Sequence, residues 1–248
     1  VAFEATLAAY GVEFVADVIY APLETNEFTP YLQQVLDSGA EVLLPIWAGD
    51  TSVALFQQIA ELGVNSSMKV VGAFNSNDIV AASDPSNVNN ISWIVYHYSF
   101  PQNEVNDWLV EQHLAYYPNP FTQTPDYPDL FTECAFATAQ AIFAGVTATD
   151  GSTLPEALIP ALEGLAFAGP KGNYYIRPSD HQALVPMYIA QLVNLDDPEF
   201  KYYELLNTVS AIQSAPPCSL PEDLADRCEL DAYFMTMVAE MEAEAASE

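Results

Sequence analysis

Val12-Glu-Phe-Val-Ala-Asp-Val-Ile-Tyr20 is the first of three short apolar runs, and it is followed by Glu41-Val-Leu-Leu-Pro-Ile-Trp47 and Lys69-Val-Val-Gly-Ala-Phe74. Runs rich in β-branched and aromatic residues that lie between glycines and prolines predict strands. Apolar residues recur at helical spacing over residues 28–37 and 51–62, which predicts a helix between each pair of strands. Because parallel strands need long crossovers, this βαβαβ order predicts an α/β fold whose parallel sheet is flanked by helices.

Small ligands of such sheets bind beyond the carboxyl ends of the strands. Tyr20 ends the first predicted strand, Trp47 ends the second and precedes Asp50, and Asn75 follows the third. We therefore expect these residues to contact a ligand. Two alternatives stay open: Trp47 packs against the core, and Asn75 caps a helix that begins near Ile79.

Composition narrows the classes of partner. The 248 residues contain 34 acidic and five basic side chains, which give a net charge of -29. This charge repels nucleic acid and anionic lipid surfaces, so neither is expected as a partner. The acids are spread along the chain, which favours a solvated surface over a cation-collecting patch. No unbroken apolar run approaches the ~20 residues of a membrane helix, so no membrane insertion is expected.

The three cysteines do not form a zinc pattern, and no metal site is expected. Cys218 and Cys228 flank an acidic loop and can close a disulfide if the protein is exported, whereas Cys134 lies on an apolar helix and is expected to be a buried thiol. Motifs of nucleophilic hydrolases, phosphate-binding loops, dinucleotide-binding folds and zinc proteases are absent from the sequence. The sequence therefore predicts no enzyme and no cofactor.

The rest of the chain continues to mix strands and helices. We expect a strand over residues 91–98, a helix over 101–117, a proline-rich break over 118–128 and a buried apolar helix over 127–146. A loop over 164–172, strands over 173–176 and 185–193 and an apolar run over 203–212 follow. Lys171 is expected on the surface, and Glu133 is either a buried acid or a solvated acid at a helix edge.

Several strings resemble the second lobe of type I periplasmic binding proteins, and most closely the branched-chain amino acid (leucine/isoleucine/valine) receptors of ABC importers. They are Tyr20-Ala-Pro-Leu-Glu-Thr-Asn-Glu-Phe-Thr-Pro-Tyr-Leu32, Ser38-Gly-Ala-Glu-Val-Leu-Leu44, Phe167-Ala-Gly-Pro-Lys-Gly172 and Ile176-Arg-Pro-Ser-Asp-His-Gln-Ala-Leu184. The resemblance covers residues 1–212. It implies two Rossmann-like lobes, joined by a three-stranded hinge, that close on a small ligand.

By this resemblance, residues 1–118 form lobe two and residues 119–184 form a part of lobe one. Residues 185–215 return to lobe two, and residues 216–248 form a C-terminal extension with an acidic tail. The first half of lobe one is then missing, together with any signal or lipid-attachment sequence, because Val1 already lies in a helix-like pattern.

The family places an aromatic residue after the second strand of lobe two and a polar or acidic residue after the third. The first position falls on Trp47 or Ala48, and the second falls near Phe74 and Asn75. Amino acid receptors carry a glutamate at the second position, and the nearest acid here is Asp78. This difference disfavours a plain amino acid and leaves an amino-acid-like, amide or carboxylate ligand.

The resemblance implies an extracytoplasmic solute-binding protein of an ABC importer, periplasmic or extracellular, with a lipid anchor if the missing N-terminus carries one. Its partners would be a small-molecule ligand and a membrane permease. A ligand-sensing receptor or regulatory domain on the same fold is the alternative, and composition does not choose between them.

Overall fold

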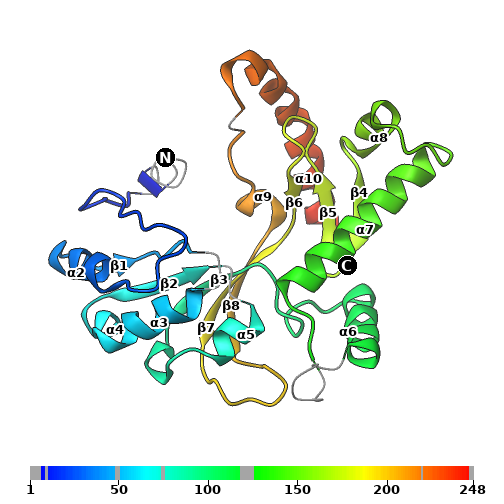
Figure 1. Ribbon diagram of the computed structural model, residues 1–248. Coiled ribbons are helices and arrows are strands. Elements are labelled where there is room, and N and C mark those ends of the chain that lie inside the picture. Colours follow the sequence, from blue (N-terminus) through cyan, green and yellow to red (C-terminus); the bar gives the residue numbers. More distant parts are fainter. Residues whose placement is uncertain are drawn as a thin grey trace. The chain divides into compact units, whose positions relative to one another are not determined.

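Two groups of residues form separate compact units in the computed structural model, which describes residues 7–8, 11–47, 51–73, 76–117, 126–218 and 220–245 (Figure 1). Unit 1 comprises residues 1–93 and 190–204, and unit 2 comprises residues 94–189 and 205–248. The chain passes from one unit to the other within strands β3 (Ile91–Ile94), β7 (Met187–Leu192) and β8 (Tyr203–Val209). The first crossing thus lies well before the proline-rich break, and the lobe boundaries given by the resemblance stay predictions.

Unit 1 alternates helices and strands in the order that the sequence predicts from residue 28 onward. Its elements are α2 (Thr29–Asp37), β1 (Val42–Leu43), α3 (Ser52–Glu61), α4 (Val64–Ser67), β2 (Lys69–Ala73), α5 (Asn77–Ala81), η1 (Pro85–Asn87) and the start of β3. The strand order is β1-β2-β3-β7-β8, and β2 pairs in parallel with both β1 and β3. The predicted α/β architecture with a parallel sheet is therefore confirmed.

The first predicted strand is wrong. Residues 12–20 form no strand, and several of their apolar side chains are exposed, with Tyr20 reaching 79%. An extended run becomes a strand only when a neighbouring strand satisfies its backbone groups. β1 is the edge of the sheet and only two residues long, and its pairing in the described structure is with β2.

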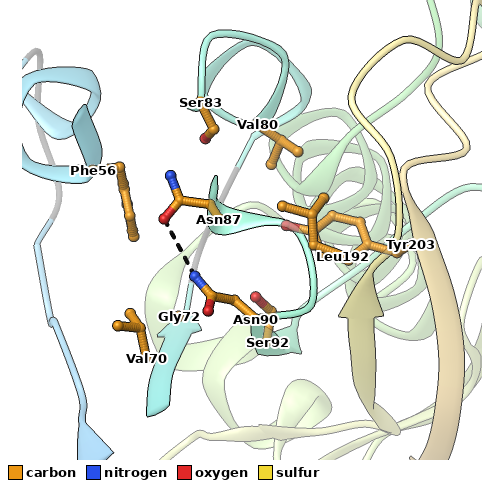
Figure 2. Close-up of a pocket in the computed structure, with 10 residues that line it drawn as sticks. All are labelled: Phe56, Val70, Gly72, Val80, Ser83, Asn87, Asn90, Ser92, Leu192 and Tyr203. Atoms are coloured by element: carbon orange, nitrogen blue, oxygen red, sulfur yellow. Dashed lines mark hydrogen bonds between the residues drawn. The ribbon is translucent and has the colours of Figure 1, made fainter. Parts of the chain in front are cut away.

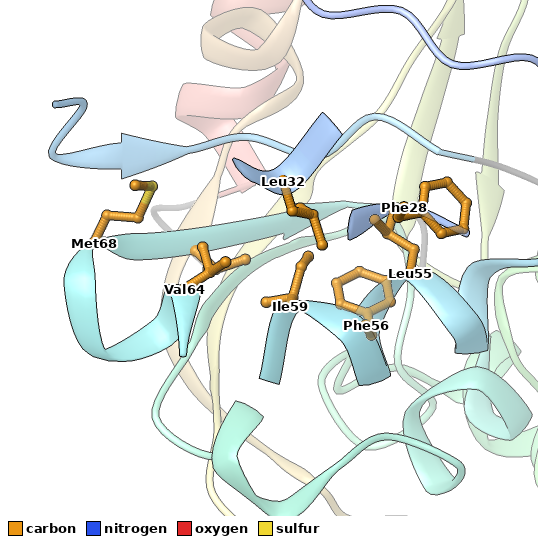
Figure 3. Close-up of a cluster of buried hydrophobic side chains, with 8 residues drawn as sticks. Phe28, Leu32, Leu55, Phe56, Ile59, Val64 and Met68 are labelled. Carbon is orange, nitrogen blue, oxygen red and sulfur yellow. The ribbon is translucent and has the colours of Figure 1, made fainter. Parts of the chain in front are cut away.

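The core of unit 1 lies between helices α2 and α3, the turn of α4, and strand β2 (Figure 3). Ile59 and Val64 are fully buried within it. Gly63 adopts a left-handed conformation, with φ +68°, that lets the chain turn from α3 into α4 at little steric cost. The buried members of this cluster are Phe28, Leu32, Leu55, Phe56, Ile59, Val64, Met68 and Val70.

Unit 2 combines helices with a small antiparallel sheet of order β4-β5-β6. Asn103 caps helix α6 (Glu104–Tyr116) and Asp129 caps helix α7 (Leu130–Ala148): each side chain accepts a hydrogen bond from a backbone N–H of the first turn. β4 falls in a segment that the sequence predicts as a loop. The elements are α6 (Glu104–Tyr116), α7 (Leu130–Ala148), α8 (Pro155–Leu162), β4 (Ala166–Gly169), β5 (Gly172–Ile176), β6 (Ala183–Leu184), α9 (Ala211–Ser214), η2 (Glu222–Leu230) and α10 (Asp231–Ala245).

Helix α7 is not buried, contrary to the prediction. Phe131 is 67% exposed and Phe143 is 75% exposed, and the Cys134 thiol is exposed as well. The helix contacts α8 and β4 with part of its surface. By length and composition α7 could cross a membrane, and it is the one helix of the described ranges that passes this test. A search for an unbroken apolar run misses α7, because polar residues interrupt the run. The mean hydropathy of the helix averages over these residues and therefore detects it.

Cys218 and Cys228 form a disulfide, with their Cα atoms 5.8 Å apart. Arg227, next to this bond, donates to the carbonyl oxygens of Pro178 and Ser179 and to the Glu163 carboxylate. These contacts hold the disulfide loop against the turn that precedes β6. Helix α10 then packs Phe234 and Val238 into a second core with Tyr175, Leu184 and Ala211.

Candidate functional site

Strand β1 ends at Leu43 and is thus shorter than the predicted strand over residues 41–47, and Trp47 follows four residues beyond this carboxyl end, the edge at which ligands of such sheets bind. Its ring meets the Phe28 ring edge-on, with centroids 5.1 Å apart and an interplanar angle of 88°. The indole Nε1 donates to Thr51 Oγ1 over 3.0 Å. The packing interpretation of Trp47 therefore holds. Because the ring is only half-buried and is held in orientation at both its apolar and its polar edge, it also offers a fixed stacking surface.

Tyr20 is placed differently. It lines an open depression of about 480 Å³ together with residues 16–19, Tyr31 and Gln34. The phenol ring is mostly in solvent, and the preceding residues form no strand to fix it. The other predicted contacts, Ala48, Asp50, Phe74 and Asn75, lie outside the described residues. Of the six predicted ligand contacts, the structure thus describes Trp47 and Tyr20. Contact with a ligand stays a prediction for all six.

The polar residues after β2 are partly described. Ser76 is buried at the N-terminus of α5, and its carbonyl oxygen accepts the Val80 N–H at 3.1 Å. Its side chain makes no capping hydrogen bond, and the helix begins at Asn77, two residues before the predicted start. Asp78, the nearest acid to the end of β2, is exposed in the first turn of α5, where the helix dipole favours a negative charge.

Sequence reasoning missed a buried polar cluster in unit 2. The Glu133 carboxylate on α7 is 2% exposed, accepts a hydrogen bond from the Tyr174 hydroxyl and lies 3.6 Å from Cys134 Sγ. Burial raises the pKa of Glu133, because a charged carboxylate loses its hydration there. The prediction left Glu133 either buried or solvated, and the structure shows it buried.

Lys171 belongs to the same cluster and contradicts its prediction as a surface residue. It is 5% exposed, and its Nζ lies 3.5 Å from Met187 Sδ. Burial lowers the pKa of Lys171 to about 8, and the Glu133 charge opposes part of this decrease. The turn between β4 and β5 is held by Asn103, whose side chain donates to Pro170 O at 2.9 Å. A glycine-rich turn looks exposed in sequence, and only its docking reveals that the lysine points inward.

Two of the histidines are held by neighbouring side chains. His181 is half-exposed, and its Nε2 lies 2.9 Å from a Glu163 oxygen that also accepts from Arg227. His97 is buried among the rings of Tyr98 and Phe100. No group of three potential metal ligands occurs among the residues that the structure describes. What the described part of the site offers is an oriented indole, an exposed phenol and hydrogen-bonding groups after β2.

Comparisons with known proteins agree with this architecture. A family model described as "Periplasmic binding protein" matches residues 1–197. Leu/Ile/Val-binding protein homolog 6 of Brucella melitensis is 26% identical over 201 residues, which cover 79% of this chain and 50% of that protein. The chain therefore spans about half the length of the curated relatives it matches.

Solved structures are similar over most of the chain. An ABC-type branched-chain amino acid transporter from Rhodopseudomonas palustris CGA009 superposes with a TM-score of 0.70 at 26% identity, covering 89% of this chain and 58% of its own. A solute-binding protein from Rhodopseudomonas palustris HaA2, in complex with p-hydroxybenzoic acid, has a TM-score of 0.70 at 20% identity over 84% of this chain and 55% of its own. The second likeness shows the fold alone.

These relatives are named as binding or transport proteins rather than enzymes, and they share the type I periplasmic-binding-protein fold predicted from the resemblance. The family model spans far more than half of the 248 residues. The chain belongs to the periplasmic binding protein family.

Proposed function

We propose that this chain is part of an extracytoplasmic solute-binding protein of an ABC importer. The observation that carries the proposal is the oriented, half-buried indole of Trp47 at the carboxyl end of β1, in a chain of this family. Ligand binding would favour a closed form of the protein, and a membrane permease would recognise that form.

The proposed ligand is a small amino-acid-like, amide or carboxylate compound. Relatives are named for branched-chain amino acids, and one structural neighbour holds p-hydroxybenzoic acid. A flat ligand suits the Trp47 ring, because aromatic stacking adds to the burial of area. The nearest acid after β2, Asp78, is exposed and lies on a helix, which favours ligands that do not depend on an ammonium group.

A thermal-shift panel tests this proposal. The protein with its native sequence is mixed, at high and at low salt, with each of four kinds of compound. These are branched-chain amino acids, short amides, benzoate and hydroxybenzoates. A ligand that binds only the folded form at about 100 times its Kd stabilises it by about 2.7 kcal/mol, so a true ligand raises the melting temperature. The net charge of -29 should weaken anionic ligands most at low salt. No shift for any compound would contradict the proposed ligand class.

Replacing Trp47 with alanine is expected to weaken binding of the ligand so found by at least ~1 kcal/mol, because a stacking surface is lost. Isothermal titration calorimetry measures the change. Trp47→Phe keeps a ring against Phe28 and should lose less affinity. Trp108→Ala, which removes a half-exposed tryptophan from α6, is the matched control and should leave affinity unchanged. If Trp47→Ala and the unsubstituted protein bind the ligand with equal affinity, Trp47 packs against the core and does not contact the ligand.

The proposal places the protein outside the cytoplasm, where oxidising conditions permit the Cys218–Cys228 bond. Attachment by a lipid and recognition by a permease are further parts of this proposal. A periplasmic extract probed with a thiol-specific reagent, with and without prior reduction, tests the location. Before reduction, Cys218 and Cys228 are expected not to react with the reagent. Labelling of both cysteines without reduction would contradict a location outside the cytoplasm.

Loss of this disulfide is expected to cost about 2–3 kcal/mol of stability, chiefly by freeing a short loop in the unfolded chain. The double variant Cys218→Ser, Cys228→Ser is compared with the oxidised protein by chemical denaturation, and hydrogen exchange reports on residues 220–245. Faster exchange in η2 and α10 should accompany the loss. Cys134→Ser removes the exposed free thiol and serves as the control.

A further inference from the structure

A small cavity in unit 1 lies between the sheet and the helices that cover it (Figure 2). Its volume is about 20 Å³, which exceeds the roughly 10–15 Å³ that a single water molecule needs. Apolar and polar side chains line it together, so it differs from a dry packing defect. The lining residues are Phe56, Val70, Gly72, Val80, Ser83, Asn87, Asn90, Ser92, Leu192 and Tyr203.

Asn87 and Asn90 line this cavity, and the Asn65 side chain contacts both of them. Asn87, which ends η1, is 3% exposed. Its Oδ1 accepts from Asn65 Nδ2 at 3.0 Å and from Asn90 Nδ2 at 3.3 Å. Asn90 Nδ2 also lies 3.4 Å from Asn65 Oδ1. The two donors fix the orientation of the Asn87 amide, because a flipped amide would place three NH₂ groups against one another.

In this orientation of the Asn87 amide, its NH₂ group has no acceptor among the asparagines. Asn87 Nδ2 is buried and has no hydrogen-bond partner among the described residues. In Figure 2 this nitrogen points away from Asn90, to the side on which Ser83 and Phe56 lie. An unmade hydrogen bond at a buried amide costs about 1–3 kcal/mol, so a partner in the cavity is strongly favoured.

We propose that the cavity binds one water molecule, which accepts a hydrogen bond from Asn87 Nδ2. The Ser83 hydroxyl donates its hydrogen bond to Ile79 O at 3.0 Å, so the Ser83 oxygen can accept a hydrogen bond from this water. An ammonium ion is excluded because it offers no acceptor to Asn87. An anion is disfavoured because no lining residue carries a positive charge. The water would thus tie η1 to the end of α5, the helix that begins at Asn77, shortly after the predicted ligand contacts Phe74 and Asn75.

A high-resolution crystal structure and a solution measurement test the proposal on the full chain. One ordered water is expected within hydrogen-bond distance of Asn87 Nδ2, at about 3 Å. Rotating-frame water exchange spectra of ¹⁵N-labelled protein should show a cross-peak between a long-lived water and the Asn87 side-chain amide protons. A cavity without density, or an Asn87 amide that donates to a protein oxygen, overturns the proposal.

A cavity-filling variant tests the same water independently. Val80→Ile adds a methyl group from the cavity wall and should remove both the density and the cross-peak, with a lower melting temperature. Val64→Ile is the matched control: Val64 is equally buried in unit 1 and does not line the cavity, so the water should remain. If the density of the water persists unchanged in Val80→Ile, the water does not lie in this cavity and the proposal is wrong. If that variant does not fold, the measurements on the unsubstituted protein decide.

Discussion

Replacing Ile59 with alanine is expected to lower the free energy of unfolding of unit 1 by about 2–5 kcal/mol. Ile59 on α3 is 0% exposed, and it packs in the cluster that joins α2, α3, α4 and β2 (Figure 3). Its truncation removes buried methyl and methylene groups and leaves a cavity that the surrounding side chains fill only in part. Chemical denaturation, followed by tryptophan fluorescence, measures the loss.

Ile46→Ala is the control for this prediction. Ile46 is the same type of residue in the same unit, but it is 56% exposed, so its truncation should change stability by less than about 1 kcal/mol. Equal losses for Ile59→Ala and Ile46→Ala would show that the cluster around α3 does not hold unit 1 together. Because Trp47 packs on Phe28 in the same cluster, Ile59→Ala should also weaken ligand binding.

Replacing Lys171 with methionine is expected to stabilise unit 2 by about 1–3 kcal/mol at pH 7. The pKa of Lys171 falls from 10.5 to about 8 because burial outweighs the attraction of Glu133, and a net change of this size corresponds to about 3 kcal/mol against the charged form. Methionine has a similar length and no charge to bury. The attraction to Glu133, which opposes the effect of burial, is already contained in the value of about 8.

The pH dependence gives a second readout. Between pH 8 and 10.5 the folded protein binds fewer protons at Lys171 than the unfolded chain does, so the free energy of unfolding rises with pH in this window. Lys171→Met should lack this rise, and its advantage should fade as the pH approaches about 10. Denaturation curves at pH 7, 8, 9 and 10 measure both effects.

Lys201→Met provides the comparison for Lys171→Met. Lys201 is half-exposed and forms a surface ion pair with Glu199, so its replacement should change stability by less than about 1 kcal/mol. A destabilised Lys171→Met protein, or an unsubstituted protein whose stability is flat from pH 8 to 10, would show that the buried ammonium has other partners and is not strained.

Patterns within a short stretch predicted most of unit 1. Helices α2 and α3 follow from apolar residues at helical spacing, and β2 follows from a β-branched run that begins at Lys69, because local spacing decides which side of an element faces the core. The same reasoning failed for residues 12–20, whose alternation is as good as that of a strand. A strand needs a hydrogen-bonded neighbour, and no property of a single run supplies one.

The sequence by itself determined the α/β class, the order of elements in unit 1 from residue 28 onward, the acidic charge and the family. Only the tertiary structure decided that Lys171 and Glu133 share a buried cluster, that α7 exposes Phe131 and Phe143, and that Asn87 directs an amide into a cavity. The reason is physical: class and order depend on local periodicity, whereas burial and the pairing of polar groups depend on contacts between segments far apart in the chain.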